Sequence, residues 1–386
     1  MGKVLASVVM MRRISCGNNR LCIVALGAGS KSISGRSLTK KGVQVHDCHA
    51  EVLARRGLLR FLYSQLEELK NDKSRTSIFT KRDDGVCTLK KAVSFHLFIS
   101  KPPCGDASVF GLHENHHNRL SRGIARVTPA DGEGAVRISW PPEEDKTFED
   151  FTSPQTSARA RLHKMCCSAK IARWNVVGVQ GALLSLYIEP VYFSSITIGS
   201  EFSDLHMSRA VYDRVSTIRD LPLSYHVSCP DLHYVSMKKP SETIKSHKMS
   251  LNWCLEHTVG QVVPSYEELI ECSFGKQRTG ELSRLSKREL FKRFLSLWDS
   301  LAPKPTRKMA RKKMQGLAMT EYCYHTVKAL AKDYQIAKEK VAEHFSRKKY
   351  GGSRWLRMPK EVDQFSLCDP EEDTWDNLIA AMHSSS

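Results

Sequence analysis

The sequence has no apolar run of the roughly 18 residues that a membrane-spanning helix needs, and it shows no secretory signal peptide. The apolar start at residues 4–11 is too short to span a bilayer, and Arg12 and Arg13 follow it. We therefore expect an intracellular protein with no membrane partner. Its 12 cysteines should stay reduced instead of forming a disulfide scaffold.

Carboxylates are scarce relative to cations. The 386 residues include 41 Asp and Glu but 59 Lys and Arg, which gives a formal net charge of +18 with histidine neutral. Such an excess predicts an acidic partner, with nucleic acid as the first candidate; a basic enzyme with diffuse charge is the alternative. The apolar content of 41% is ordinary for a globular protein, and the sequence shows no internal repeat.

One stretch, residues 46–56, combines a histidine and a glutamate at the expected start of a helix. His49 and Glu51 form a His-x-Glu pattern, the first half of the signature of zinc-dependent nucleobase deaminases. The pattern alone is weak, because a histidine and a glutamate on a helix surface occur by chance in many chains. Apolar residues at helical spacing predict a helix over residues 49–69.

Two cysteines could complete a metal site with this histidine. Cys104 follows an apolar run at 92–100 that predicts a buried strand, and a Pro-Cys-Gly turn that opens a helix is the second half of the signature. Cys167 begins another predicted helix. One His and two Cys leave the fourth position of a catalytic zinc for water, and helix N-termini stabilise thiolates. Buried, reduced core cysteines are the alternative.

The order of the remaining elements predicts an α/β layered core. We expect further strands at 3–11, 21–28, 183–189 and 191–198, and further helices at 204–216, 281–300 and 321–346. Residues 1–367 should form one domain, in which 1–219 carry the zinc site and 220–367 close a second pocket. Residues 368–386 are acidic and then Ser-rich, which predicts a frayed tail.

Three longer features carry a family resemblance. The cysteines lie 63 residues apart (167 − 104), Cys-His-Ala-Glu-Val at 48–52 is followed by Arg55 and Arg56, and residues 170–178 read Lys-Ile-Ala-Arg-Trp-Asn-Val-Val-Gly. In these features the chain resembles the adenosine deaminases acting on RNA, from about residue 3 to residue 367, without a double-stranded-RNA-binding domain. The resemblance implies a three-layer α/β/α, cytidine-deaminase-like core with a mostly helical C-terminal half.

The resemblance also implies an activity, the zinc-dependent hydrolysis of adenosine to inosine in double-stranded RNA, in the nucleus or alternatively the cytoplasm. It makes Glu51 the group that moves protons, and it implies three zinc ligands: His49, Cys104 and Cys167. Asp47 would help orient the site through Lys170. A helix N-cap is an alternative role for Asp47, and the two roles can coexist.

Contacts with RNA are expected in two loops. A Gly-Glu-Gly turn follows Asp131, and by resemblance Glu133 at its tip flips the target base out of the duplex; a Gly-rich hairpin turn is the alternative. Basic side chains in these loops are candidates for phosphate contacts: Lys31, Arg119, Arg122 and Arg126.

A second set of residues predicts a site for a dense anion. Positions 324, 328, 334 and 338 fall within an arc of roughly 120° if they share one helix, which places two Lys and two Tyr on one face. A solvated basic face is the alternative. The resemblance implies buried inositol hexakisphosphate, bound by Arg55, Arg56, Lys170, Arg173, Trp174, Lys287, Tyr324, Lys328, Tyr334, Lys338, Trp355 and Asp363. His46, Ala169, Arg357 and Met358 depart from the commoner family residues.

Two other functions compete with editing of double-stranded RNA. A tRNA-specific adenosine deaminase would share the zinc and inositol phosphate sites. A catalytically silent RNA-binding relative typically loses a ligand or the glutamate, and all four positions are intact here. We also expect that a recruiting protein, or a homologue that carries double-stranded-RNA-binding domains, could bring the chain to its RNA.

Overall fold

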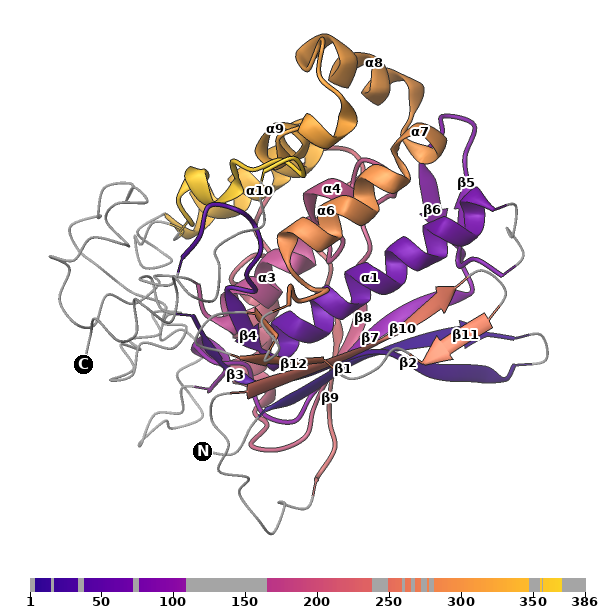
Figure 1. Cartoon of the computed structure of the whole chain (residues 1–386). Coiled ribbons are helices and arrows are strands. Elements are labelled where there is room, and N and C mark those ends of the chain that lie inside the picture. The colour runs from indigo at the N-terminus through magenta and orange to yellow at the C-terminus, as the bar shows by residue number, and fades with distance from the viewer. Residues whose placement is uncertain are drawn as a thin grey trace, which may run out of the picture.

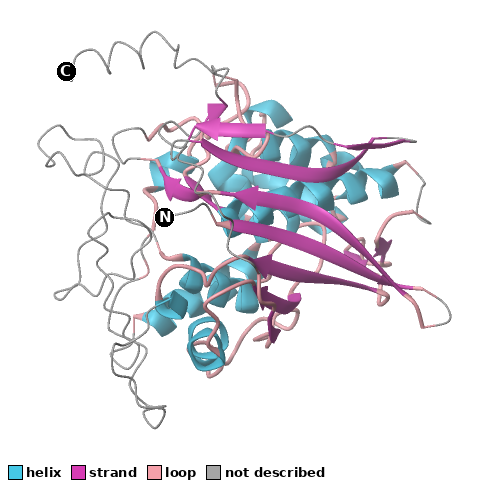
Figure 2. Ribbon diagram, turned by 90° about the horizontal axis from the view of Figure 1, so that it is seen from below, coloured by secondary structure: helices cyan, strands magenta, loops and turns pink. Residues whose placement is uncertain are grey.

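A mixed β-sheet forms the base of the molecule. The computed structural model describes residues 4–14, 17–33, 38–71, 76–108, 165–237, 249–258, 261–264, 268–271, 276–277, 281–346, 355 and 357–369. Within them the sheet has nine strands in the order β13-β12-β10-β2-β1-β7-β8-β9, and β11 pairs with β10. Figure 2, seen from below, shows this sheet in front of the helices, so the described helices lie on one side of it.

The centre of the sheet is built from strands that the sequence predicts. β1 (Leu5–Arg13) and β2 (Asn19–Ala28) form an antiparallel hairpin with an irregularity between Val8 and Val9. β7 (Val93–Ile99) runs antiparallel to β1, and β8 (Phe193–Ile198) runs parallel to β7. Alternate residues of β7 are buried, as expected for a strand with one face on the core. These strand predictions are confirmed.

Five strands between residues 231 and 277 extend the sheet, although the sequence pattern there predicts no element. They are β9 (Asp231–Tyr234), β10 (Met249–Thr258), β11 (Gln261–Pro264), β12 (Glu268–Glu271) and β13 (Lys276–Gln277). Four short strands pair outside this sheet: β3 (Ser30–Ser32) with β4 (Asp47–His49), and β5 (Phe79–Lys81) with β6 (Cys87–Leu89).

The long helix α1 (Ala50–Lys70) lies directly on the sheet, as Figure 1 shows. It crosses β2 at a point where the strand has no side chain. A Cβ added to Gly27 would lie 2.7 Å from the backbone nitrogen of Ala54 and 2.8 Å from the Cβ of Leu53. The backbone nitrogen of Ala50 also donates to the Gly29 carbonyl at 3.1 Å. The close approach fixes where α1 begins, and with it the position of His49.

The other helices complete the same side of the molecule. They are α3 (Cys167–Val177), α4 (Gly181–Leu184), α5 (Asp204–Ser208), α6 (Lys287–Ser296), α7 (Trp298–Leu301), α8 (Lys304–Lys313), α9 (Tyr324–Ala329) and α10 (Lys332–Phe345). Single turns occur at η2 (Asp106–Ser108), η3 (Arg209–Asp213), η4 (Met319–Glu321) and η6 (Lys360–Asp363). Figure 1 places α9 and α10 farther from the sheet than α1.

Four expectations about elements need correction. The helix predicted at 281–300 begins only at Lys287 and is two helices, α6 and α7. The strand predicted at 183–189 is wrong, because α4 and the turn after it occupy that stretch. The helix predicted at 321–346 is two helices, α9 and α10, which meet near Leu330. The helix predicted after Cys104 is represented among the described residues only by the turn η2.

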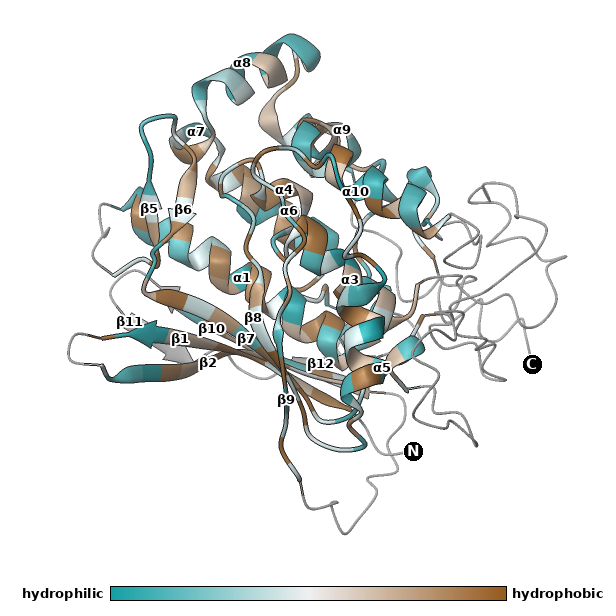
Figure 3. Ribbon diagram, turned by 180° about the vertical axis from the view of Figure 1, so that it is seen from behind, coloured by the Kyte–Doolittle hydropathy of each residue, from teal (hydrophilic) through white to brown (hydrophobic). Residues whose placement is uncertain are grey.

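The hydrophobic core joins the two ends of the sequence. One cluster of buried side chains contains Ala6 and Phe95 from the sheet together with Phe294, Phe345 and Phe365 from the C-terminal part. Figure 3 shows apolar residues gathered where the helices face the sheet. The predicted α/β class is confirmed, but the described helices cover one face of the sheet, so the described residues form two layers and not the three that the resemblance implies. The division at residue 219 stays a prediction. No helix in the described ranges is long and apolar enough to cross a membrane.

Candidate metal centre and a neighbouring cationic cavity

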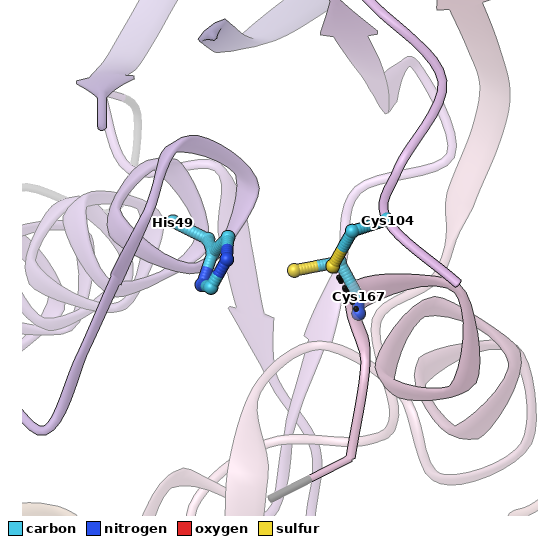
Figure 4. A group of neighbouring side chains, drawn as sticks. All are labelled: His49, Cys104 and Cys167. Atoms are coloured by element: carbon cyan, nitrogen blue, oxygen red, sulfur yellow. Dashed lines mark hydrogen bonds between the residues drawn. The ribbon is translucent and has the colours of Figure 1, made fainter. Parts of the chain in front are cut away.

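Three side chains from distant segments meet above the end of the sheet. His49 is the N-cap residue of α1, Cys104 follows β7, and Cys167 begins α3. Their possible ligand atoms all lie within 4.8 Å of one another. Figure 4 shows the His49 ring facing the two sulfurs. The sequence predicts that these residues share one metal ion, and the geometry permits it.

Backbone hydrogen bonds hold the two cysteine segments together. The backbone nitrogen of Cys167 donates to Cys104 Sγ at 3.4 Å. The backbone nitrogen of Ser168 donates to the Cys104 carbonyl at 3.0 Å, and its hydroxyl lies 3.0 Å from the Pro103 carbonyl. Sequence reasoning did not single out Ser168. Its place in the first turn of a helix that starts at a candidate ligand was the available signal.

Gly105 allows these segments to come so close. Its φ of +97° lies in a region that side chains other than glycine rarely adopt. A Cβ at this position would lie 2.7 Å from the Cβ of Cys166 and closer still to its sulfur. The glycine of the Pro-Cys-Gly turn is therefore needed for the turn itself and for its contact with the start of α3.

A chain of polar contacts orients His49. Its Nδ1 lies 2.6 Å from Asp47 Oδ1, and the other Asp47 oxygen contacts Lys170 Nζ. Burial opposes the charged imidazole, but the Asp47 carboxylate outweighs it, so the pKa of His49 is raised. Because Nδ1 is occupied by Asp47, Nε2 is the nitrogen left for a metal. Asp47 is not the N-cap of α1, since His49 holds that position.

The pKa values of the two thiols are shifted in opposite directions. A hydrogen bond from the Cys167 side chain lowers the pKa of Cys104 to about 7, against the effect of burial and with help from His49. Burial and the neighbouring Cys104 raise the pKa of Cys167. Thiols bind a divalent cation as thiolates, so a metal bound here would displace the thiol protons. One His and two Cys are a ligand set that suits zinc.

Glu51 stands beside this cluster without belonging to it. It lies in the first turn of α1, two residues after His49, and only 3% of its surface is exposed. Its charge contributes to the pKa of His49, Cys104 and Cys167, which places its carboxylate near all three. A buried carboxylate next to a metal site is positioned to accept a proton from water.

The expected RNA contacts cannot be placed in the same way. Arg119, Arg122, Arg126 and Glu133 lie outside the described residues. Lys31 lies in β3, where its backbone pairs with Cys48 next to His49, but its side chain is not among those described.

Lys170, which contacts Asp47, also lines a cavity of about 510 Å³. Seven cationic side chains and two carboxylates line it. Among the residues predicted to bind a dense anion, the cavity is lined by Lys170, Arg173, Lys287, Lys328, Lys338, Trp355 and Asp363.

The single helix face predicted for this site is wrong. Tyr324 and Lys328 lie on α9, whereas Tyr334 and Lys338 lie on α10. Lys328 and Lys338 nevertheless both reach the cavity, because the two helices adjoin it. Tyr324 lies next to Lys328, whose Nζ is 4.9 Å from the ring centre, and Tyr334 lines a neighbouring groove instead.

Asp363 forms ion pairs with two of the lysines that line the cavity. Asp363 contacts Lys328 Nζ and lies 2.6 Å from Lys287 Nζ. Burial opposes its ionisation, but Lys287 and Lys328 hold the pKa of Asp363 well below its usual range. Burial, together with nearby Lys328 and Arg173, lowers the pKa of Lys338 to about 8. Asp363 balances only part of the positive charge around the cavity.

Several nitrogen donors beside the cavity have no partner within the described part of the chain. They are Arg55 Nε, Arg173 Nε and Trp174 Nε1, and all three are buried. Arg55 stacks over Trp174 at 5.4 Å, and Arg173 stacks over Trp355 at 5.2 Å. Arg56 differs, because its Nε donates to the Leu285 carbonyl at 2.6 Å. Buried donors without acceptors destabilise a protein, so these donors fit an anion that accepts from them.

Comparisons with known proteins agree with this site. The profile of the adenosine-deaminase (editase) domain matches residues 25–359. The chain is 36% identical to the double-stranded RNA-specific editase Adar of Drosophila melanogaster over 377 residues, which are 95% of this chain and 52% of the relative. It is 32% identical to the double-stranded RNA-specific adenosine deaminase of Mus musculus over 400 residues, 96% of this chain and 31% of the relative.

A relative of another kind is more distant in sequence but closer in length. The tRNA-specific adenosine deaminase 1 of Drosophila melanogaster is 29% identical over 375 residues, which cover 94% of this chain and 90% of that protein. The chain spans about half the length of the first two double-stranded RNA editases that it matches. Because the family profile covers most of its length, this chain belongs to the adenosine-deaminase (editase) domain family.

Proposed function

We propose that this protein hydrolyses adenosine to inosine and ammonia in double-stranded RNA. The observation that carries the proposal is the convergence of His49, Cys104 and Cys167 beside the buried carboxylate of Glu51. The family assignment supports it, and so do the names of the relatives that act on double-stranded RNA.

Each residue has a chemical task in this proposal. His49 Nε2 and the sulfurs of Cys104 and Cys167 hold zinc, which supplies the Lewis acidity that makes water nucleophilic at neutral pH. Glu51 accepts a proton from the attacking water and passes it to the purine ring nitrogen. It then takes the proton of the new hydroxyl group on C6 and gives it to the amine, which leaves as ammonia while the C6 carbonyl forms. Asp47 and Lys170 keep the His49 ring in place.

Access to an adenosine in a duplex requires that the base leave the stack. We assign Glu133 to the space that the base vacates, and four cations to nearby phosphates: Lys31, Arg119, Arg122 and Arg126. These assignments rest on the sequence and the family resemblance. A recruiting protein, or a homologue with double-stranded-RNA-binding domains, is part of the proposal. We place this activity in the nucleus.

The cavity beside Lys170 is proposed to hold inositol hexakisphosphate. Its support is the excess of seven cations over two carboxylates and the three unpartnered donors of Arg55, Arg173 and Trp174. Burying so many cations without an anion would cost several kcal/mol per charge. Lys170 lines the cavity and also contacts Asp47, so it would link the anion to the histidine that binds zinc.

A tRNA substrate is the second candidate, because the tRNA-specific adenosine deaminase 1 of Drosophila melanogaster is 29% identical over 94% of this chain. The experiment incubates the purified protein with duplex RNA and with tRNA and then sequences both for A-to-G changes. Conversion in the duplex supports the proposal. Conversion restricted to tRNA would show that tRNA, and not double-stranded RNA, is the substrate. Binding without conversion in either RNA would indicate a catalytically silent relative.

A further inference from the structure

Helix α8 is the most cationic element in the described part of the chain. Its sequence, Lys-Pro-Thr-Arg-Lys-Met-Ala-Arg-Lys-Lys, has six cations in ten residues and no carboxylate. The neighbouring helix α10 differs, because its three lysines alternate with one Asp and two Glu. Figures 1 and 3 show α8 projecting from the helical side of the molecule, away from the sheet.

Five of these cations form a continuous band, the α8 stripe, which consists of Lys304, Arg307, Lys308, Arg311 and Lys312. At 100° per residue they fall within an arc of about 140°, over a length of about 12 Å. Ala310, which is fully buried, lies on the opposite face of the helix. Four members of the stripe are exposed and Arg307 is half-buried, so the helix is anchored by one face and presents the other.

The stripe is not neutralised by its surroundings. Within the described ranges no carboxylate forms an ion pair with any of its members, and Arg307 donates to the backbone carbonyl of Asp299. Asp84, which lines the groove beside Pro303 and Thr306, pairs with Arg82.

Such a helix is disfavoured in isolation. Like charges four residues apart, such as Lys304 with Lys308 and Lys308 with Lys312, destabilise a helix. Lys304 in the first turn also opposes the helix dipole, whereas Arg311, Lys312 and Lys313 in the last turn favour it. A polyanion bound along the stripe would relieve the repulsion between the like charges.

We propose that the α8 stripe binds the phosphate backbone of duplex RNA, as a second contact away from the metal centre. The identity of the polyanion rests on the proposed function, and the need for a polyanion rests on the charge and exposure of α8. Lys and Arg spaced along one helix face match a row of phosphates, and such contacts hold the nucleic acid in register without reading its sequence.

The test measures the affinity of the full chain for a labelled duplex RNA by fluorescence anisotropy at several salt concentrations. The triple variant Lys308→Ala, Arg311→Ala and Lys312→Ala removes three exposed cations and keeps good helix formers. Each lost phosphate contact lowers the slope of log affinity against log salt by about 0.9, so we expect the slope to fall by about 2–3. The charge-preserving exchange Lys308→Arg, Arg311→Lys and Lys312→Arg should retain the wild-type slope.

A matched control removes the same charge elsewhere. Arg13, Arg20 and Lys91 are exposed residues at one end of the sheet, and their triple change to Ala should lower the slope by less than one. An equal fall of the slope in this control would show that the affinity for RNA depends on net charge alone. An unchanged slope in the α8 variant would show that the stripe does not contact RNA. Either result overturns the inference.

Two further arms separate this inference from other interpretations. Normal RNA binding by the α8 variant, with lost binding to vesicles rich in phosphatidylserine, would assign the stripe to a membrane surface and overturn the inference. Inosine is measured in the same wild-type samples. If the α8 variant lowers the slope but the wild type forms no inosine, the RNA contact stands and the proposed deaminase function fails. If the wild type forms inosine but the α8 variant keeps the slope, the inference about the α8 stripe fails and the proposed function stands.

Discussion

At the scale of single residues, the chemistry depends on Glu51. The change Glu51→Gln keeps the size of the side chain but removes its capacity to accept a proton. We expect bound zinc and RNA affinity to be retained, and inosine formation to fall by about 10²–10⁴-fold, the usual contribution of a general acid and base. Mass spectrometry of digested RNA measures inosine, and metal analysis measures zinc. Conversion by the Glu51→Gln variant near the wild-type rate would show that Glu51 is not the general acid and base.

Asp47 belongs to the same scale, because it contacts both His49 and Lys170. The change Asp47→Asn removes the charge that orients the His49 ring, so we expect zinc affinity to fall by about 10–100-fold. Competition with a chelator measures this affinity. Asp84→Asn is the control, since Asp84 also contacts a cationic side chain, Arg82, but lies away from the metal centre. Equal zinc affinity in the two variants would contradict the role of Asp47.

Lys338 provides a pH-dependent test of the cavity. Burial, together with Lys328, Arg173 and Arg357, lowers the pKa of Lys338 to about 8, below its value in the unfolded chain. Between these two pKa values the unfolded chain holds more protons, so the group's contribution to the stability of the anion-free protein rises with pH. A bound phosphate favours protonated Lys338 instead.

Lys338 should therefore take up a proton when inositol hexakisphosphate binds near pH 8. The affinity of the protein for inositol hexakisphosphate should decrease as the pH rises above that value. Calorimetry in buffers with different heats of ionisation measures the uptake. Lys338→Met should abolish most of it. Binding that is independent of pH between about 7 and 9.5 would contradict the placement of Lys338 against the anion.

At the scale of elements, the start of α1 depends on the bare backbone of β2. The change Gly27→Ala places a Cβ 2.7 Å from the Ala54 nitrogen, so either the helix or the strand must shift. We expect a loss of about 1–3 kcal/mol in the free energy of unfolding, as for other overpacked sites, and weaker zinc binding because His49 begins that helix. Leu21→Val on the same strand is the control, since Leu21 is 66% exposed. Denaturant unfolding that gives equal stabilities would contradict this packing.

Elements with clear periodicity could be predicted from the sequence, and those decided by tertiary contacts could not. Strands β1, β2, β7 and β8 and helices α1 and α3 follow local patterns. Leu183 and Leu184 have the apolar character of a strand, yet the chain turns there as α4 and packs against α6, α9 and α10. β10 pairs with β2 through contacts far apart in sequence, and no local signal predicted that register.

At the scale of the whole molecule, the candidate site is made of segments that the chain keeps far apart. The residue types of the zinc site and of the cation cluster could be predicted from motifs and resemblance. Their meeting depends on contacts that no local pattern encodes, such as the Ser168 hydrogen bonds and the close fit of Gly105 against Cys166. The division of α9 from α10 also changes how Lys328 and Lys338 reach one cavity.

The central claim is that His49, Cys104 and Cys167 hold one zinc ion. X-ray absorption at the zinc edge of the purified protein tests it most directly, together with a count of metal per chain. The account predicts one zinc with two sulfur neighbours at about 2.3 Å and nitrogen or oxygen neighbours at about 2.0–2.1 Å, and loss of the metal in Cys167→Ala. A protein that binds no zinc, or whose zinc has no sulfur neighbours, would contradict the account.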